Sequence, residues 1–228
     1  MTTQPNGVHH LALATGDIKQ QIAFFTDVLG MELVALYWMH GVKGAWHGFL
    51  KLNDKSSIAF VQTPETPSIK PLMGVSYAGN AGNPSAPGTM QHLALNVDDA
   101  AQLLTMRDRI RSRGVNVIGP IDHGFCQSIY FAGPENLTLE ISSSQLAIDP
   151  RAWIDPEVVA LAGITEQELA GYCAPAAYAG LHGAVTQPPI DLAKPHMTYP
   201  KAVYEKMLAM SDAQFTATRS YTQPPVSV

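Results

Sequence analysis

Cysteine, charge and long apolar runs are all scarce in this chain of 228 residues. Its two cysteines, Cys126 and Cys173, form neither a disulfide framework nor the Cys-x-x-Cys spacing of a structural zinc site. Charged residues make up 14% of the chain and the formal net charge is −5, so the basic footprint of a nucleic-acid-binding protein is missing. No apolar stretch reaches the roughly 18 residues of a membrane span, and no charged head followed by an apolar run marks a signal peptide. We therefore expect a soluble, cytoplasmic protein whose partners include neither nucleic acid nor membrane.

A short motif is present twice. His10-Leu-Ala-Leu near the N-terminus matches His92-Leu-Ala-Leu, and Asp17 and Asp99 follow the two copies at the same distance. The two histidines are 82 residues apart, and so are the two aspartates. Because a repeat at fixed spacing usually marks one supersecondary unit per copy, a site shared between two halves is the leading hypothesis.

Hydrophobic periodicity predicts the same order of elements after each copy. In the first half we expect a strand, a helix ended by Gly30 and three further strands, over 8–14, 18–29, 31–39, 45–52 and 57–63. In the second half we expect the same elements over 90–97, 98–113, 115–118, 126–132 and 137–142. The sequence thus predicts an α+β fold in which two β-α-β-β-β modules, 8–63 and 90–143, form a curved mixed sheet around a metal cup.

The rest of the chain differs in composition from the two modules. A proline- and glycine-rich linker covers 64–89, and the paired modules with this linker make up a domain over 1–144. Residues 145–228 read as an irregular and helical extension that packs on the core, covers the site or reaches a partner subunit. Its two histidines, His182 and His196, are not expected to take part in the chemistry.

Alternation along the strands places several polar side chains on one face, because residues i and i+2 of a strand share a face. His10, His92, Glu140 and Tyr130 all fall on the side away from the helices, whereas His9 falls on the packing side. Two imidazoles and one carboxylate are the ligand set of the facial triad, which suits non-heme Fe(II), with Mn or Zn as possible substitutes. We therefore predict a metal site at His10, His92 and Glu140.

Further histidines are candidates for proton transfer, since the unperturbed pKa of histidine is near neutrality. His47 lies in a predicted strand of the first module, and His123 lies in the loop before the strand of Tyr130. We expect Tyr130, His123 and His47 to be the catalytic candidates.

The motifs taken together resemble the glyoxalase/bleomycin resistance/dioxygenase superfamily, which has the vicinal oxygen chelate fold, over about residues 8–143. The segments that carry the resemblance are His10-Leu-Ala-Leu with Asp17, Phe24-Phe-Thr-Asp-Val-Leu-Gly30, His92-Leu-Ala-Leu-Asn-Val-Asp98, and Tyr130-Phe-Ala-Gly-Pro-Glu-Asn-Leu-Thr-Leu-Glu140. Within it, the arrangement is most similar to type I extradiol ring-cleaving dioxygenases. That resemblance implies Fe(II), a catechol-like substrate, O₂, a role in aromatic compound catabolism and a homo-oligomer, with Tyr130 donating a hydrogen bond to the substrate.

The chain departs from the dioxygenase pattern at one place. Ser56 and Ser57 stand where such enzymes carry an acid–base histidine, so either His47 or His123 replaces it or the chemistry differs. Phe60 is assigned to the place in the first module that corresponds to Glu140, which disfavours the four-ligand site of glyoxalase I. The alternatives are another metal-dependent activity, such as isomerase or lyase chemistry through a bound enediolate, or a small-molecule binding protein.

Overall fold

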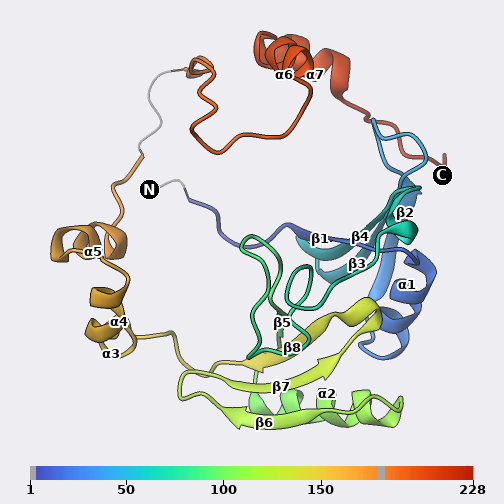
Figure 1. Cartoon of the computed structure of the whole chain (residues 1–228). Coiled ribbons are helices and arrows are strands. Elements are labelled where there is room, and N and C mark those ends of the chain that lie inside the picture. Colours follow the sequence, from blue (N-terminus) through green and yellow to red (C-terminus); the bar gives the residue numbers. More distant parts are fainter. Residues whose placement is uncertain (1–3, 179–182, 228) are drawn as a thin grey trace. The chain divides into compact units, whose positions relative to one another are not determined.

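A computed structural model describes residues 4–178 and 183–227 (Figure 1). One compact unit spans Asn6–Pro175 and holds both sheets. The described residues outside it, 4–5, 176–178 and 183–227, belong to a second unit. His182 lies outside the described residues.

The first module has the predicted order of elements. They are β1 (His10–Ala14), α1 (Ile18–Asp27), β2 (Glu32–Trp38), β3 (Trp46–Asn53) and β4 (Ser56–Gln62). The Asp17 carboxylate caps α1 by accepting a hydrogen bond from the backbone N–H of Gln20 at 3.0 Å. Gly30 follows the helix with φ of +79°, a conformation that favours glycine. The sheet order is β1-β4-β3-β2, with β1 parallel to β4.

The second module repeats this arrangement. Its elements are β5 (Leu93–Asn96), α2 (Ala100–Ser112), β6 (Ile118–Asp122), β7 (Gln127–Ala132) and β8 (Thr138–Ser143). Asp99 caps α2 in the same way, with Gln102 as the donor at 2.8 Å. The sheet order, β5-β8-β7-β6 with β5 parallel to β8, matches that of the first module. The predicted α+β fold of two repeated modules is confirmed, each module forming a four-stranded mixed sheet.

Shorter elements complete the described chain. Two 3₁₀ turns, η1 (Thr66–Ser68) and η2 (Pro134–Asn136), lie in the linker and before β8. Helices α3 (Pro150–Trp153), α4 (Pro156–Leu161) and α5 (Glu166–Cys173) belong to the same unit as the modules. Helices α6 (Lys201–Leu208) and α7 (Asp212–Arg219) belong to the second unit. Within the described ranges, no helix combines the length and hydropathy that crossing a membrane requires.

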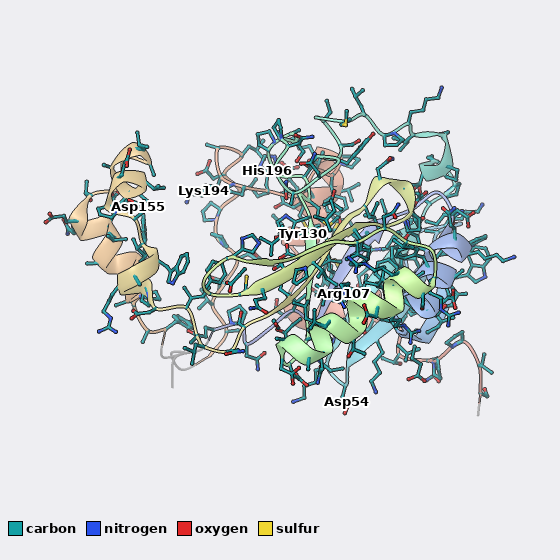
Figure 2. All side chains as sticks on the ribbon, turned by 90° about the horizontal axis from the view of Figure 1, so that it is seen from below. Asp54, Arg107, Tyr130, Asp155, Lys194 and His196 are labelled. Atoms are coloured by element: carbon teal, nitrogen blue, oxygen red, sulfur yellow. The ribbon has the colours of Figure 1, made fainter. Side chains whose placement is uncertain are left out.

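One hydrophobic core unites the two modules. Its buried members are Leu13, Ile18, Phe25, Val28, Leu29, Leu50, Ile58 and Phe60 from the first module and Leu95, Leu103, Ile110, Ile129, Phe131, Leu139 and Ile141 from the second. Phe25 of α1 and Phe60 of β4 are fully buried, with ring centroids 5.0 Å apart in an edge-on arrangement. Charged pairs such as Lys51–Asp54 and Arg107–Asp108 lie on the surface; Figure 2 labels Asp54 and Arg107.

The second module also holds both ends of α1. Near its N-terminus, the Glu135 carboxylate accepts hydrogen bonds from Thr15 Oγ1, Gly16 N and Gln21 Nε2, at 2.5, 2.7 and 2.8 Å. At its C-terminus, the Arg109 guanidinium donates to the carbonyls of Val28 and Asp27, at 3.0 and 2.9 Å. A negative group at the N-terminus and a positive group at the C-terminus both complement the helix dipole. These contacts fix α1 against the second module.

Candidate metal centre

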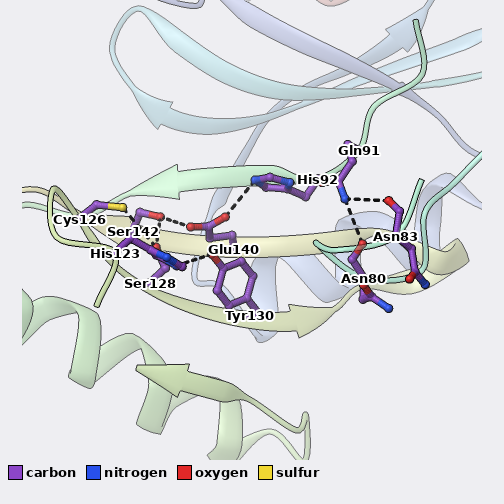
Figure 3. A network of polar contacts seen from close by, with 10 residues as sticks. All are labelled: Asn80, Asn83, Gln91, His92, His123, Cys126, Ser128, Tyr130, Glu140 and Ser142. Atoms are coloured by element: carbon purple, nitrogen blue, oxygen red, sulfur yellow. Dashed lines mark hydrogen bonds and ion pairs between the residues drawn. The ribbon is translucent and has the colours of Figure 1, made fainter. Parts of the chain in front are cut away.

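His92 and Glu140 form the centre of a polar network on the second sheet (Figure 3). His92 Nε2 lies 3.0 Å from Glu140 Oε2. His92 immediately precedes β5, and Glu140 projects from β8 with a side chain only 6% exposed. The parallel pairing of β5 with β8 places Ala94 opposite Glu140 and thereby brings the histidine just before β5 close to this carboxylate.

Hydroxyl groups surround the Glu140 carboxylate. Ser142 donates to Glu140 Oε1 at 2.6 Å, and the hydroxyls of Ser128 and Ser142 are 2.8 Å apart. Burial opposes ionisation, but hydrogen bonds from Ser128, Ser142 and Tyr130, together with the charge of His92, hold the pKa of Glu140 below its usual value. Glu140 is therefore an ionised carboxylate at neutral pH, the form that binds a cation.

Tyr130 and His123 extend the network along β7. The Tyr130 hydroxyl lies 2.9 Å from His123 Nε2, and Tyr130 pairs with Glu140 across the β7–β8 ladder. Burial, followed by the nearby charge of Glu140, raises the pKa of the Tyr130 phenol. The phenol therefore stays protonated at neutral pH and can donate a hydrogen bond to an oxygen of a bound ligand.

The remaining two candidates, His10 and His47, lie on the first sheet. Their ring centroids are 6.2 Å apart, and both rings pack near Phe49, at 5.5 and 4.4 Å. Over residues 4–178 and 183–227, no three His, Cys, Asp or Glu side chains lie close enough together to hold a metal ion. The structure thus brings together His92 and Glu140 of the three predicted ligands, while His10 as the third ligand stays a prediction.

The position in the first module that corresponds to Glu140 is Ala59, not Phe60. Ala59 pairs with Ala12 in the first sheet as Glu140 pairs with Ala94 in the second, and Ala12 and Ala94 are related by the repeat. Phe60 instead packs into the core against Phe25. A slip of one residue along a strand moves a side chain to the opposite face, which explains the incorrect assignment. Neither Ala59 nor Phe60 is a carboxylate, so the four-ligand site stays disfavoured.

Comparison with known proteins identifies the family. The model of the glyoxalase/bleomycin resistance protein/dioxygenase superfamily matches residues 7–141, the stretch that carries both modules. The chain belongs to this superfamily.

Relatives within the superfamily differ in their reactions. The lactoylglutathione lyase of Salmonella typhimurium is 29% identical over 140 residues, covering 58% of this chain and 88% of the lyase. The biphenyl-2,3-diol 1,2-dioxygenase 2 of Rhodococcus globerulus is 30% identical over 141 residues, covering 62% of this chain and 64% of the dioxygenase. A superfamily domain from Frankia sp. EAN1pec is 15% identical, with a TM-score of 0.48 over 62% of this chain and all of that one.

The donor chemistry at His92 and Glu140 fits a superfamily metal ion. His92 Nδ1 faces Gln91 Oε1 while Nε2 faces Glu140 Oε2, so both ring nitrogens meet oxygen acceptors. A neutral imidazole carries one N–H and satisfies one of these two acceptors, so a metal ion bound at Nε2 would make both contacts favourable. His92 Nε2 and Glu140 Oε2, 3.0 Å apart, are an imidazole nitrogen and a carboxylate oxygen, the donor types that would hold such an ion.

Sequence reasoning missed several members of this network. Gln91, Ser128 and Ser142 were absent from the candidates, although Ser128 and Ser142 share the strand face of Tyr130 and Glu140. Cys126 joins the same row, with its Sγ 3.7 Å from Ser128 Oγ. Strand alternation is sufficient to identify Cys126, Ser128 and Ser142, which lie on β7 and β8 or directly before β7. The contact of Gln91 depends instead on the fold of the linker.

His47 should make the stability of the protein depend on pH. Burial, followed by the charge of His10, lowers the pKa of His47 from its ordinary value of 6.5, and its Nε2 is buried without a hydrogen-bond partner among the described residues. The unfolded chain therefore binds this proton more tightly than the folded protein. We expect the free energy of unfolding to be highest above pH 6.5 and to fall as the pH drops from 6.5 toward the lowered pKa.

Urea unfolding of the wild type and of His47→Gln at several pH values from 7.5 to about 5 tests this expectation. The wild type should lose more stability than His47→Gln over that range. His196→Gln, which changes an exposed histidine of the second unit, serves as the matched control. Equal losses in the wild type and His47→Gln would contradict the assignment.

Proposed function

We propose that this superfamily member is a metal-dependent enzyme that cleaves a catechol-like aromatic substrate with O₂ in the extradiol manner. In this proposal His92 and Glu140 are two ligands of an Fe(II) ion and His10 is the third. Because His10 lies on the other sheet, the proposal includes a homo-oligomer, in which a second copy can present its His10 to the pair. The observation that carries it is the Tyr130 hydroxyl, which lies 2.9 Å from His123 Nε2 on the residue paired with Glu140, the carboxylate that contacts His92.

The side chains around the pair support roles in binding and orientation. Fe(II) bound there would supply the redox chemistry that lets a catechol react with O₂. Glu140 brings the negative charge, and its serine partners keep the carboxylate in one orientation. Tyr130 donates its proton in a hydrogen bond to a substrate oxygen, while His123 orients the phenol and exchanges a proton with it.

Lyase or isomerase chemistry through a bound enediolate is the second candidate. It is favoured by the lactoylglutathione lyases, which match this chain over 88% of their own length. It is disfavoured by Ala59, because the first module offers no carboxylate at the position that corresponds to Glu140. An Fe(II) site with one carboxylate agrees better with the facial triad.

Oxygen uptake tests the proposal. The protein is reconstituted anaerobically with Fe(II), and uptake is followed on a panel of small catechols, with S-lactoylglutathione turnover measured in parallel. Uptake coupled to a yellow ring-opened product supports the dioxygenase. Tight iron binding without uptake overturns the dioxygenase and favours non-oxidative chemistry at the same site. Absence of metal binding overturns the site itself.

Tyr130→Phe should separate catalysis from metal binding. This change removes the phenolic proton but leaves Glu140 and His92 in place, so we expect kcat to fall by about 100-fold while the metal content stays unchanged. Tyr172→Phe, an exposed residue of α5, is the matched control and should keep wild-type activity. An unchanged kcat in Tyr130→Phe would contradict its role as a donor.

A further inference from the structure

The side-chain amide of Gln91 is held in one orientation by the linker. Its Nε2 donates to the backbone carbonyls of Asn80 and Asn83, at 3.1 and 3.3 Å (Figure 3). A carbonyl oxygen only accepts, so the NH₂ group of Gln91 must face these two residues. Its carbonyl oxygen therefore points the other way, toward His92.

This orientation gives Nδ1 of His92 a hydrogen-bond acceptor of its own. Gln91 Oε1 contacts His92 Nδ1, and an oxygen acceptor is satisfied only if Nδ1 carries a hydrogen. A neutral ring with its hydrogen on Nδ1 has its lone pair on Nε2, the nitrogen that would bind a metal. Without a metal, Glu140 Oε2, 3.0 Å from Nε2, competes with Gln91 for that hydrogen. Ligand histidines commonly donate their other N–H to an acceptor in this way, which fixes both the tautomer and the ring orientation.

The first module shows a related contact at the equivalent place. His9 precedes His10 as Gln91 precedes His92, and His9 Nδ1 lies 3.0 Å from His10 Nδ1. In both copies of the repeat, the residue before the motif histidine contacts its Nδ1. Both copies of the motif thus place a polar side-chain atom of the preceding residue at Nδ1 of the histidine.

We infer that Gln91 is a positioning residue for the metal site, which favours the Nδ1–H tautomer of His92 and thereby leaves Nε2 to bind a metal. The linker segment 80–83 takes part in the site by fixing the Gln91 amide. The inference rests on the proposed function, because it assumes that His92 is a metal ligand.

Gln91→Met tests the inference, since it keeps a side chain of similar length and removes both the acceptor and the donor. The first readout is the tautomer of His92 in the metal-free protein at about pH 8.5, measured by long-range ¹H–¹⁵N NMR. The share of the Nδ1–H form is expected to be larger in the wild type than in Gln91→Met, because Glu140 is the remaining acceptor in the variant. An equal share of the Nδ1–H form in the two proteins would overturn the inference.

The second readout is affinity for Fe²⁺ under anaerobic conditions. We expect Gln91→Met to bind Fe²⁺ about 10-fold more weakly than the wild type, as is usual when an outer-shell partner of a ligand histidine is removed. Gln20→Met, an exposed residue of α1, is the matched control, and His92→Ala reports loss of the ligand itself. If the wild type binds no Fe²⁺, the proposed function fails while the tautomer still tests Gln91. If His92→Ala loses Fe²⁺ and Gln91→Met does not, only the further inference fails.

Discussion

Replacing Glu140 with Gln is expected to lower the affinity for Fe²⁺ by about 100-fold or more, because even outer-shell partners contribute 10- to 100-fold. The amide keeps the size of the side chain but removes the negative charge that faces His92 Nε2. It also places a possible donor where Ser142 now donates. Anaerobic titration with Fe²⁺ measures the loss, and circular dichroism checks that the variant is folded.

Glu65→Gln is the matched control, since Glu65 is an exposed residue in the linker. It changes the net charge by the same amount and should bind Fe²⁺ as the wild type does. His92→Ala should lose as much affinity as Glu140→Gln, because each removes one ligand of the proposed site. Wild-type affinity in either of the two site variants would rule out this pair as metal ligands.

Replacing Glu135 with Ala is expected to lower the free energy of unfolding by about 3 kcal/mol, since hydrogen bonds to charged groups contribute roughly 1.5–3 kcal/mol each and are not additive. The change removes the acceptor of three hydrogen bonds, two of them from the nearly fully buried side chains of Thr15 and Gln21. It also removes one of two carboxylates near the N-terminus of α1, where Asp17 remains as the cap. The midpoint of urea unfolding measures the loss.

A double-mutant cycle separates this contact from general effects of the substitution. Gln21→Met removes the buried donor, and the combination with Glu135→Ala should be less destabilising than the sum of the two single changes. Glu65→Ala, exposed in the linker, should stay within about 0.5 kcal/mol of the wild type. Strict additivity of Gln21→Met and Glu135→Ala would show that the two side chains do not interact.

Local signals in the sequence were sufficient to predict the modules. Each of these signals lies within a short stretch of sequence. They are the repeated His-Leu-Ala-Leu motif, the capping aspartates Asp17 and Asp99, and the apolar alternation of the strands. The structure has the same elements in the same order. Strand alternation also placed Tyr130 and Glu140 on one face, where the structure brings them together with His92 and His123.

Contacts between distant segments were harder to predict. The assignment of Phe60 failed because correspondence between the modules depends on the pairing register of β1 with β4, which places Ala59 at that position. Gln91 was missed because its role depends on two backbone carbonyls of the linker. The distance from His10 to His92 depends on how two sheets meet, and strand periodicity carries no information on that arrangement.

Because both ends of α1 contact the second module, α1 cannot complete its packing until late in synthesis on the ribosome. Thr15 and its acceptor Glu135 are 120 positions apart, and Arg109 lies 81 positions after Val28. Synthesis proceeds from the N-terminus at roughly 5–20 residues per second. Several seconds or more therefore pass between the synthesis of α1 and that of the second-module residues that contact it. During that interval both ends of α1 and part of the apolar surface of the first module are exposed. Native docking of the two modules is thus a late event, which makes the nascent first module the stage most open to aggregation or chaperone binding.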